Sequence, residues 1–134
     1  MKTANVAEAV KSEHAVALLK QMYGENRVEE NAARYQLVAD GFAKEFGDKA
    51  FEFFSAPGRT EIGGNHTDHN HGKVLAGSVH LDCVAAAAPN GTHTVNLISE
   101  TYNQHLVINL DDLAPTEKTT GTEPLLKGIF AGLL

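Results

Sequence analysis

The stretch Ser55–Gly72 constrains the fold of this chain more than any other segment. It reads SAPGRTEIGGNHTDHNHG and places four glycines among charged and polar residues, between two segments with the composition of strands. Glycine supplies backbone conformations that a side chain would forbid. We therefore expect a loop of defined shape between two strands, held close to a ligand or to other backbone.

Several side chains of this stretch offer complementary hydrogen-bonding groups. Arg59 presents a planar fork of donors, Glu61 and Asp68 present paired acceptors, and His66 can donate or accept. Groups of this kind bind the hydroxyls of a polyol or the oxygens of a phosphate. The stretch is therefore the candidate functional site.

Eight residues in and just after this stretch match the spacing of one family signature: Gly58, Arg59, Gly64, His66, Asp68, Gly72, Val74 and Leu75. The chain thereby resembles the galactokinases, whose usual motif is G-R-x-N-L-I-G-E-H-x-D-Y, a short spacer and G-x-V-L-P. Galactokinases belong to the kinase superfamily that also contains the homoserine, mevalonate and phosphomevalonate kinases. The resemblance implies that galactose or a related sugar is phosphorylated by ATP, with Mg²⁺, to give the sugar 1-phosphate and ADP.

The resemblance also implies roles for individual residues. Arg59 would be the catalytic residue beside the transferring phosphoryl group, while His66 and Asp68 would bind sugar hydroxyls. Asn65 stands where the family has an acid and would take over its contact with the sugar. An amide donates as well as accepts, so the hydroxyl that it recognises can differ, and so can the sugar. The other departures are Glu61 for Asn, Gly63 for Ile, His69 for Tyr and Ala76 for Pro.

Two parts of the galactokinase machinery are not found in this sequence. The family carries a P-x-G-x-G-L-S-S-S loop around the nucleotide phosphates and, later, an aspartate that acts as the base. Neither occurs in residues 1–134, and no Walker-type loop replaces them. We therefore expect the chain to be the N-terminal, sugar-binding part of a galactokinase-like domain, truncated within a helix. Alone, it should bind sugar weakly at best and show no turnover.

Two other functions fit the same residues. His66, Asp68, His69 and His71 lie within six positions, and imidazole with carboxylate is a ligand set for zinc, iron or manganese. A metal hydrolase or metal-binding module would use them, although four ligands from one short loop match no definite geometry. Alternatively, the chain binds a sugar without catalysis, as a sensor or pseudo-enzyme. We favour the kinase, in which this chain itself holds no metal.

Composition and charge are those of a soluble globular domain. The chain has 134 residues and 43% hydrophobic content, enough for one domain with a core. A formal net charge of −6 with only 11 Lys and Arg argues against nucleic-acid binding. No leader and no run near the ~18 apolar residues of a membrane span is visible, so we predict a cytoplasmic protein with a small-molecule partner. Cys83 lies in an apolar run and is predicted to be a buried, inert thiol.

Helical patterns occupy the first third of the chain. Thr3–Tyr23 predicts one or two short helices, with Ser12 as the N-cap and Gly24 at the end. In Val28–Phe46, apolar residues recur with a 4-3-4-3-4 spacing that places them on one face of a helix, which Gly47 ends. We expect that face to pack against the core.

Strand patterns follow. Phe51–Ser55 predicts a short strand that leads into the glycine-rich loop, and Val74–Ala88 predicts a long strand that is buried on much of both faces. Pro89–Gly91 marks a hairpin-type turn. Val95–Ser99 and Leu106–Leu110 predict two further strands. The simplest arrangement of these strands is one antiparallel meander.

The fold class that follows is α+β, with N-terminal helices on one side of a mostly antiparallel sheet. The resemblance implies more, namely a domain like ribosomal protein S5 domain 2 with an unusual left-handed β-α-β crossover, which pattern alone cannot predict. A last helix is predicted to start at Thr122–Pro124 and to run through Leu125–Leu134 without a polar face. Because that helix and the strand edges would be exposed, we expect self-association.

Overall fold

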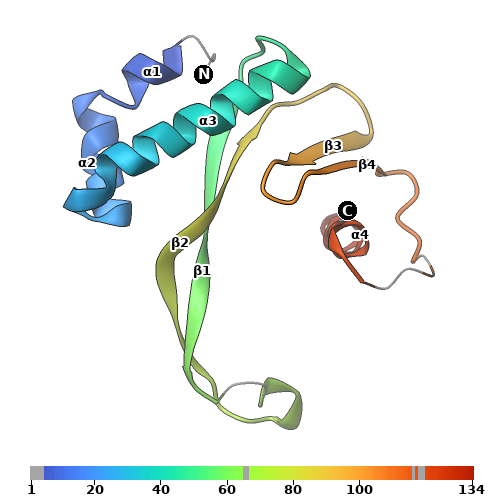
Figure 1. Ribbon diagram of the computed structural model, residues 1–134. Coiled ribbons are helices and arrows are strands. Elements are labelled where there is room, and N and C mark those ends of the chain that lie inside the picture. Colours follow the sequence, from blue (N-terminus) through green and yellow to red (C-terminus); the bar gives the residue numbers. More distant parts are fainter. Residues whose placement is uncertain (1–4, 65–66, 116, 118–119) are drawn as a thin grey trace. The chain divides into compact units, whose positions relative to one another are not determined.

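The computed structural model describes residues 5–64, 67–115, 117 and 120–134. It divides into two compact units, Met1–Ala88 and Pro89–Leu134 (Figure 1). The first unit contains the helices α1, α2 and α3 and a long ribbon of the strands β1 and β2, and the second contains the hairpin β3–β4 and the helix α4. The predicted α+β class is thus confirmed, whereas the likeness to ribosomal protein S5 domain 2 stays a prediction.

The first helices form where capping residues were predicted. α1 (Val6–Ala9) is followed by α2 (Glu13–Tyr23), and the hydroxyl of Ser12 accepts a hydrogen bond of 3.2 Å from the backbone N–H of Ala15. That bond satisfies one of the free donors in the first turn of α2. Gly24 ends α2 with a φ of 89°, a conformation that favours glycine.

α3 (Val28–Phe46) is the long helix that the 4-3-4-3-4 spacing predicted, and Gly47 ends it. Its apolar face supplies Ala39 and Phe42 to a buried cluster that also contains Val6 of α1 and Phe51, just before β1. The rings of Phe42 and Phe51 have centroids 4.9 Å apart. The core of the first unit therefore lies where α3 crosses one end of the ribbon.

The ribbon pairs β1 (Glu52–Gly63) with β2 (Leu75–Ala87) in antiparallel register. The predicted strand at Phe51–Ser55 was too short, because backbone pairing continues through the first half of the glycine-rich stretch. Pro57 does not stop the strand, since β1 is an edge strand within the described sheet and proline, which has no N–H, is tolerated at an edge. The loop proper is therefore confined to the residues between the two strands.

The prediction that β2 is buried on both faces was wrong. Asp82, Val84 and Ala86 are half-buried, whereas Cys83 and Ala85 between them are exposed. Successive side chains of a strand point to opposite faces, and only one face of this ribbon receives α3. The expectation of a buried thiol at Cys83 was wrong for the same reason.

In the second unit, β3 (Thr94–Ser99) and β4 (Gln104–Asn109) form an antiparallel hairpin, and α4 (Thr122–Leu133) lies against β4. The described strands thus make two two-stranded sheets, and the predicted single meander was wrong. The turn after Pro89 is held by local hydrogen bonds, because the Asn90 side chain accepts from the N–H of Thr92 and donates to the carbonyl of Thr94.

α4 begins within its predicted start, Thr122–Pro124, although the proline is not its first residue. The helix already includes Thr122, so Pro124 is its third residue, where the backbone N–H has no intrahelical partner in any case. The hydroxyl of Thr122 donates to the side chain of Gln104 at 3.0 Å and does not cap the helix. As predicted, apolar side chains such as Leu125 and Leu133 are exposed. No described helix is long and apolar enough to cross a membrane.

Candidate functional site

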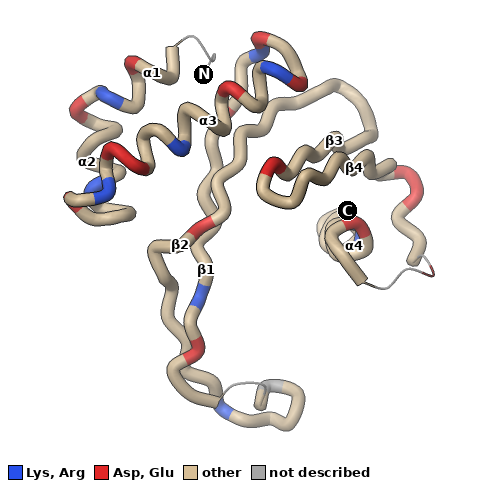
Figure 2. The backbone as a smooth tube through the Cα atoms, viewed as in Figure 1, with Lys and Arg blue, Asp and Glu red and all other residues tan. Residues whose placement is uncertain are grey.

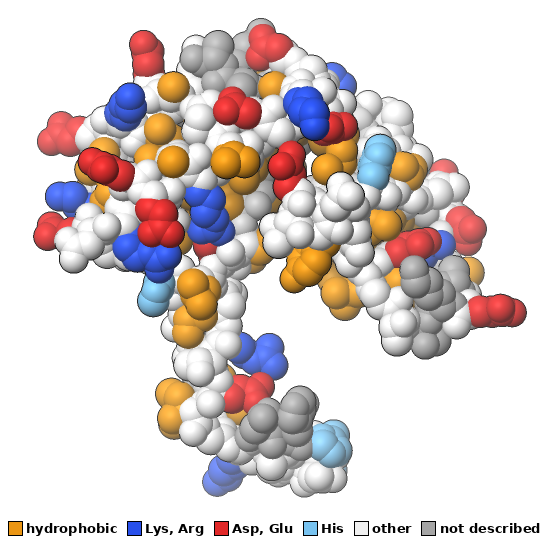
Figure 3. Space-filling model, in the orientation of Figure 1, with side chains coloured by type: hydrophobic (Ala, Val, Ile, Leu, Met, Phe, Trp, Pro, Cys, Tyr) orange, Lys and Arg blue, Asp and Glu red, His pale blue; other side chains and the backbone are white. Residues whose placement is uncertain are grey.

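The part of the glycine-rich stretch that follows β1 lies at the end of the ribbon that is far from α3 (Figure 1). Charged residues are dense on the helices and sparse along the ribbon, where Arg59 and Glu61 stand near the loop (Figure 2). Hydrophobic side chains, among them Ile62, Leu75 and Leu81, are exposed on this part of the ribbon (Figure 3). The ribbon therefore places the candidate site away from the core of the first unit.

Gly58 lies at a close approach between the two strands. A Cβ at this position would lie 3.1 Å from the carbonyl oxygen of Leu81. The pairing register shifts at the same place, between Pro57 and Arg59. A bulge of this kind bends a strand and re-aims the side chains that follow it. Gly58 therefore sets the direction in which the ribbon carries Arg59.

Thr67 is the centre of the loop between the strands. Its hydroxyl donates to the carbonyl of Gly64 at 2.7 Å, and its own carbonyl accepts from the N–H groups of Asn70 at 3.1 Å and Gly72 at 2.7 Å. Among the described residues of the loop, these bonds join its two ends. Because these hydrogen bonds join residues close together in the sequence, the local sequence was enough to predict a loop of defined shape.

Gly64 and Gly72 are the residues that let this loop close. Gly64 has a φ of 79°, and a Cβ there would collide with the carbonyl of Lys73. A Cβ at Gly72 would collide with the side chain of Thr67. Two of the glycines shared with the family signature thus serve close backbone approach, as their presence predicted.

Arg59 lies on β1 with its side chain 73% exposed. Its Nη2 is 3.1 Å from Oε1 of Glu61, whose side chain is 23% exposed. The guanidinium thus reaches solvent while one of its nitrogens is held by a neighbouring carboxylate. An exposed cation in this position can meet a phosphoryl group without a large desolvation cost.

The other predicted site residues are placed only in part. Asp68 begins a short 3₁₀ helix, η3 (Asp68–Asn70), but its side chain is outside the described part of the structure. Asn65 and His66 also lie outside the described residues. The structure therefore does not test which of these side chains meet one another.

The histidines of the loop bear on the metal hypothesis. His71 has a φ of 58°, and His69 shares a contact of 3.2 Å with the side-chain amide of Asn70. Among the described residues, no three His, Cys, Asp or Glu side chains gather closely enough to hold a metal ion. His66 and the Asp68 carboxylate are outside that search. The described side chains therefore give the metal hypothesis no support.

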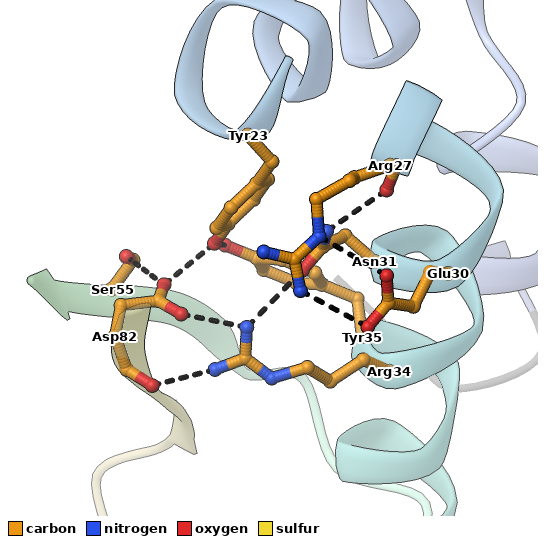
Figure 4. A network of polar contacts seen from close by, with 8 residues as sticks. All are labelled: Tyr23, Arg27, Glu30, Asn31, Arg34, Tyr35, Ser55 and Asp82. Carbon is orange, nitrogen blue, oxygen red and sulfur yellow. Dashed lines mark hydrogen bonds and ion pairs between the residues drawn. The ribbon is translucent and has the colours of Figure 1, made fainter. Parts of the chain in front are cut away.

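Sequence reasoning missed a buried polar cluster near the middle of the ribbon, centred on Asp82 (Figure 4). The side chain of Asp82 is 2% exposed, and its Oδ1 lies 2.6 Å from Nη1 of Arg34. Oδ2 accepts a hydrogen bond of 2.6 Å from the hydroxyl of Tyr23 and another from the hydroxyl of Ser55. Asp82 thereby contacts α2, α3 and β1 at once. The signal was present, because Asp82 is the one Asp, Glu, Lys or Arg residue in β2.

The contacts of this cluster control the ionisation of its members. Burial by itself would raise the pKa of Asp82, but the hydrogen bonds from Ser55, Tyr23 and Arg34 outweigh burial and place the pKa below its ordinary value. Burial, followed by the hydrogen bond to Asp82, raises the pKa of Tyr23 well above its ordinary range. Asp82 is therefore a carboxylate and Tyr23 a neutral donor at neutral pH.

Comparison with known proteins relates this sequence to one family. A family model described as the galactokinase galactose-binding signature matches residues 40–89, from the end of α3 past the end of β2. The galactokinase of Lactococcus lactis subsp. lactis (strain IL1403) is 36% identical over 95 residues, which cover 70% of this chain and 24% of that protein. The galactokinase of Lactococcus lactis subsp. cremoris (strain MG1363) is 35% identical over 85 residues, covering 63% and 21%. That of Lacticaseibacillus casei (strain BL23) is 34% identical over 73 residues, covering 54% and 19%.

No solved structure matches the chain. The matched stretch, which includes β1 and β2, is similar to a signature found in a family of kinases. More narrowly, the chain is galactokinase-like, as its signature residues predicted. It spans about a quarter or less of the length of these relatives.

Proposed function

We propose that this chain provides the sugar-recognition part of an ATP-dependent galactose kinase, which forms galactose 1-phosphate and ADP. The observation that carries the proposal is the galactose-binding signature over residues 40–89. The ribbon and the loop closed on Thr67 support it, because they present that signature as a defined surface. A related sugar is the natural variant of the proposal, since Asn65 replaces the acid of the family motif.

In this proposal, Arg59 stabilises charge on the transferring phosphoryl group. Phosphoryl transfer asks a protein mainly for positioning and for electrostatic stabilisation of the transition state. The exposed guanidinium of Arg59 supports this role. His66 and Asp68 would hold the sugar hydroxyls, with Asn65 beside them, so that one oxygen lies in line with the phosphoryl group.

ATP and Mg²⁺ are assigned to protein outside this chain. Among the described residues no acidic cluster gathers to hold a cation, and the sequence contains no phosphate loop. The curated relatives extend well beyond the matched region, which covers at most 24% of them. In a protein of that length, the remainder would supply the nucleotide site and the base, and the 134 residues alone would have no turnover.

The proposal is tested by sugar binding and by turnover. Galactose titrated into the chain should perturb the amide resonances of the loop between β1 and β2, and glucose, which differs at one hydroxyl, should perturb them less. The protein encoded by the complete reading frame should phosphorylate galactose, and Asp68→Asn should abolish that activity. Galactose that is not a substrate, together with an unperturbed loop, would refute the proposal.

One observation favours a second candidate, a sugar-binding protein without catalysis. Glu61 replaces the Asn of the family motif and forms the ion pair with Arg59. A guanidinium that is already paired is less available to a phosphoryl group. Glu61→Asn restores the family residue and frees Arg59. Galactose binding without turnover in the complete protein, with turnover gained by Glu61→Asn, would identify this second candidate.

A further inference from the structure

The pairing register of the β1–β2 ribbon shifts between Pro57 and Arg59 and again between Glu61 and Gly63, and the first shift divides the ribbon into two halves. In the half near α3, Pro57 faces Asp82, whereas in the half near the loop Arg59 faces Ser78. One residue of β1, Gly58, thus lies opposite the three residues Val79–Leu81 of β2. The registers of the two halves therefore differ by two residues.

A register difference of two residues leaves the alternation of side chains between the two faces of the ribbon unchanged. A slip of one residue would move every side chain to the opposite face, and burial would oppose it. A slip of two residues returns each side chain to its own face. The pattern of apolar residues in β1 and β2 therefore cannot determine where the register changes, and a specific contact must do so.

Asp82 stands at this boundary and makes contacts that can determine it. Its carboxylate accepts from Ser55 on β1 and from Tyr23 on α2, and it pairs with Arg34 on α3 (Figure 4). Arg34 also donates to the backbone carbonyl of Asp82 at 2.8 Å. Asn31 in turn accepts from Arg34 at 3.2 Å. Sliding β2 by two residues would break all of these contacts and leave a charged group buried without partners.

We propose that Asp82 is a positioning residue that fixes the register of the ribbon, and hence the place of Arg59 and the loop relative to the helices. Gly58 permits the shift by leaving room for the carbonyl of Leu81, and Asp82 determines that the shift begins there. The expected effect of Asp82 on sugar binding rests on the proposed function, whereas its effect on the pairing of β1 with β2 is independent of that function.

Cross-linking of engineered cysteines shows directly which residues of β1 and β2 face each other. Thr60 faces Gly77, but it would face Val79 if the register near α3 continued to the loop. Position 77 has room for a side chain, since the nearest atom to a Cβ there is Cδ1 of Ile62 at 4.0 Å. In a Cys83→Ala background, Thr60→Cys is combined with either Gly77→Cys or Val79→Cys. The fraction of intramolecular disulfide is then followed by mass spectrometry.

The native register should oxidise the 60/77 pair at least about tenfold faster than the 60/79 pair, because a disulfide needs closely opposed Cα atoms. With Asp82→Ala the ratio should fall towards one. Glu52→Ala, which removes an exposed carboxylate from the same ribbon, should keep the native ratio. A native ratio in Asp82→Ala with intact helical circular dichroism overturns the proposal. If Asp82→Ala unfolds the helices, Ser55→Ala decides, with slippage supporting the proposal and a native ratio overturning it.

A galactose titration of the same variants separates this proposal from the proposed function. If the unsubstituted chain binds galactose, Asp82→Ala should weaken binding at least about tenfold, because a displaced site loses its oriented contacts. Unchanged affinity would refute the positioning role. If the unsubstituted chain does not bind galactose, the proposed function fails, while the cross-linking ratio still tests the register.

Discussion

The hydroxyl of Tyr23 donates a hydrogen bond of 2.6 Å to the carboxylate of Asp82, across 59 positions of the chain. It joins the last residue of α2 to the middle of β2. Because the Asp82 side chain is almost fully buried, loss of a partner leaves a charge in a medium of low polarity. The cluster should therefore affect stability strongly, although it lies far from the loop along the ribbon.

The first prediction concerns acid. The pKa of Asp82 is lowered in the folded chain, so its carboxylate contributes stability that is complete above the unfolded pKa of about 3.9. That contribution is lost as the pH falls below this value towards the folded pKa. Urea unfolding at a series of pH values should show a decline below about pH 4 that is shallower in Asp82→Asn. Equal slopes in both proteins would contradict the assignment.

The second prediction concerns the donor. Tyr23→Phe removes the hydroxyl that bonds Asp82 and contacts the hydroxyl of Tyr35 at 3.1 Å. The free energy of unfolding should fall by about 1–3 kcal/mol, as for hydrogen bonds to charged groups. Tyr102→Phe is the matched control, because that side chain is 75% exposed and its loss should cost less than about 0.5 kcal/mol. Similar losses in the two variants would argue against the cluster.

The third prediction concerns the closure of the loop. Gly64→Ala places a Cβ against the carbonyl of Lys73 and at a φ that side chains rarely adopt, so it should strain the loop by about 1–3 kcal/mol. Gly63→Ala, one residue earlier, meets nothing within 4 Å and should be tolerated. Galactose titrations should show binding by Gly63→Ala and loss of binding by Gly64→Ala. Equal behaviour of the two variants would count against this loop geometry.

The fourth prediction separates catalysis from stability at Arg59. The Arg59 side chain is largely exposed, so Arg59→Ala should change the free energy of unfolding by less than about 0.5 kcal/mol. Turnover of galactose by the complete protein should fall by about 10³ or more if Arg59 stabilises the transferring phosphoryl group. A full-rate Arg59→Ala enzyme would remove Arg59 from the site. Glu61→Gln tests whether the pair itself matters.

The fifth prediction concerns the thiol. Cys83 is exposed on the ribbon face opposite α3, so a thiol reagent should label it in the folded chain. The rate should lie within about tenfold of that in urea, because access and not unfolding then limits the reaction. A rate that falls with rising protein concentration would show that self-association covers this face. Labelling that requires unfolding would contradict the exposed position.

Local signals predicted the helices well and the sheet poorly. Ser12, Gly24 and Gly47 act within one turn of their own positions, so their effect is visible in the sequence. Strand pairing depends on residues far away, and the apolar run around Cys83 looks the same in a ribbon and in a covered sheet. The galactokinase resemblance came from motif spacing alone. The Asp82 cluster was missed because its partners are up to 59 positions away.

Within the candidate site, the glycines were predictable and the partners of the side chains were not. Gly64 is needed because of its own backbone angle, which residue choice reveals. The pairing of Arg59 with Glu61 depends on the strand that places both side chains near each other. The roles of Asn65, His66 and Asp68 remain predictions from the resemblance.

The loop closed on Thr67 has a consequence for how sugar preference can change. Its frame consists of backbone groups, one hydroxyl and the glycines at 64 and 72. Asn65, His66 and Asp68, which are proposed to recognise the sugar, stand between these frame positions in the sequence. Substitution at position 65 or 68 should therefore change the sugar preference while the contacts among Gly64, Thr67 and Gly72 that shape the loop are kept.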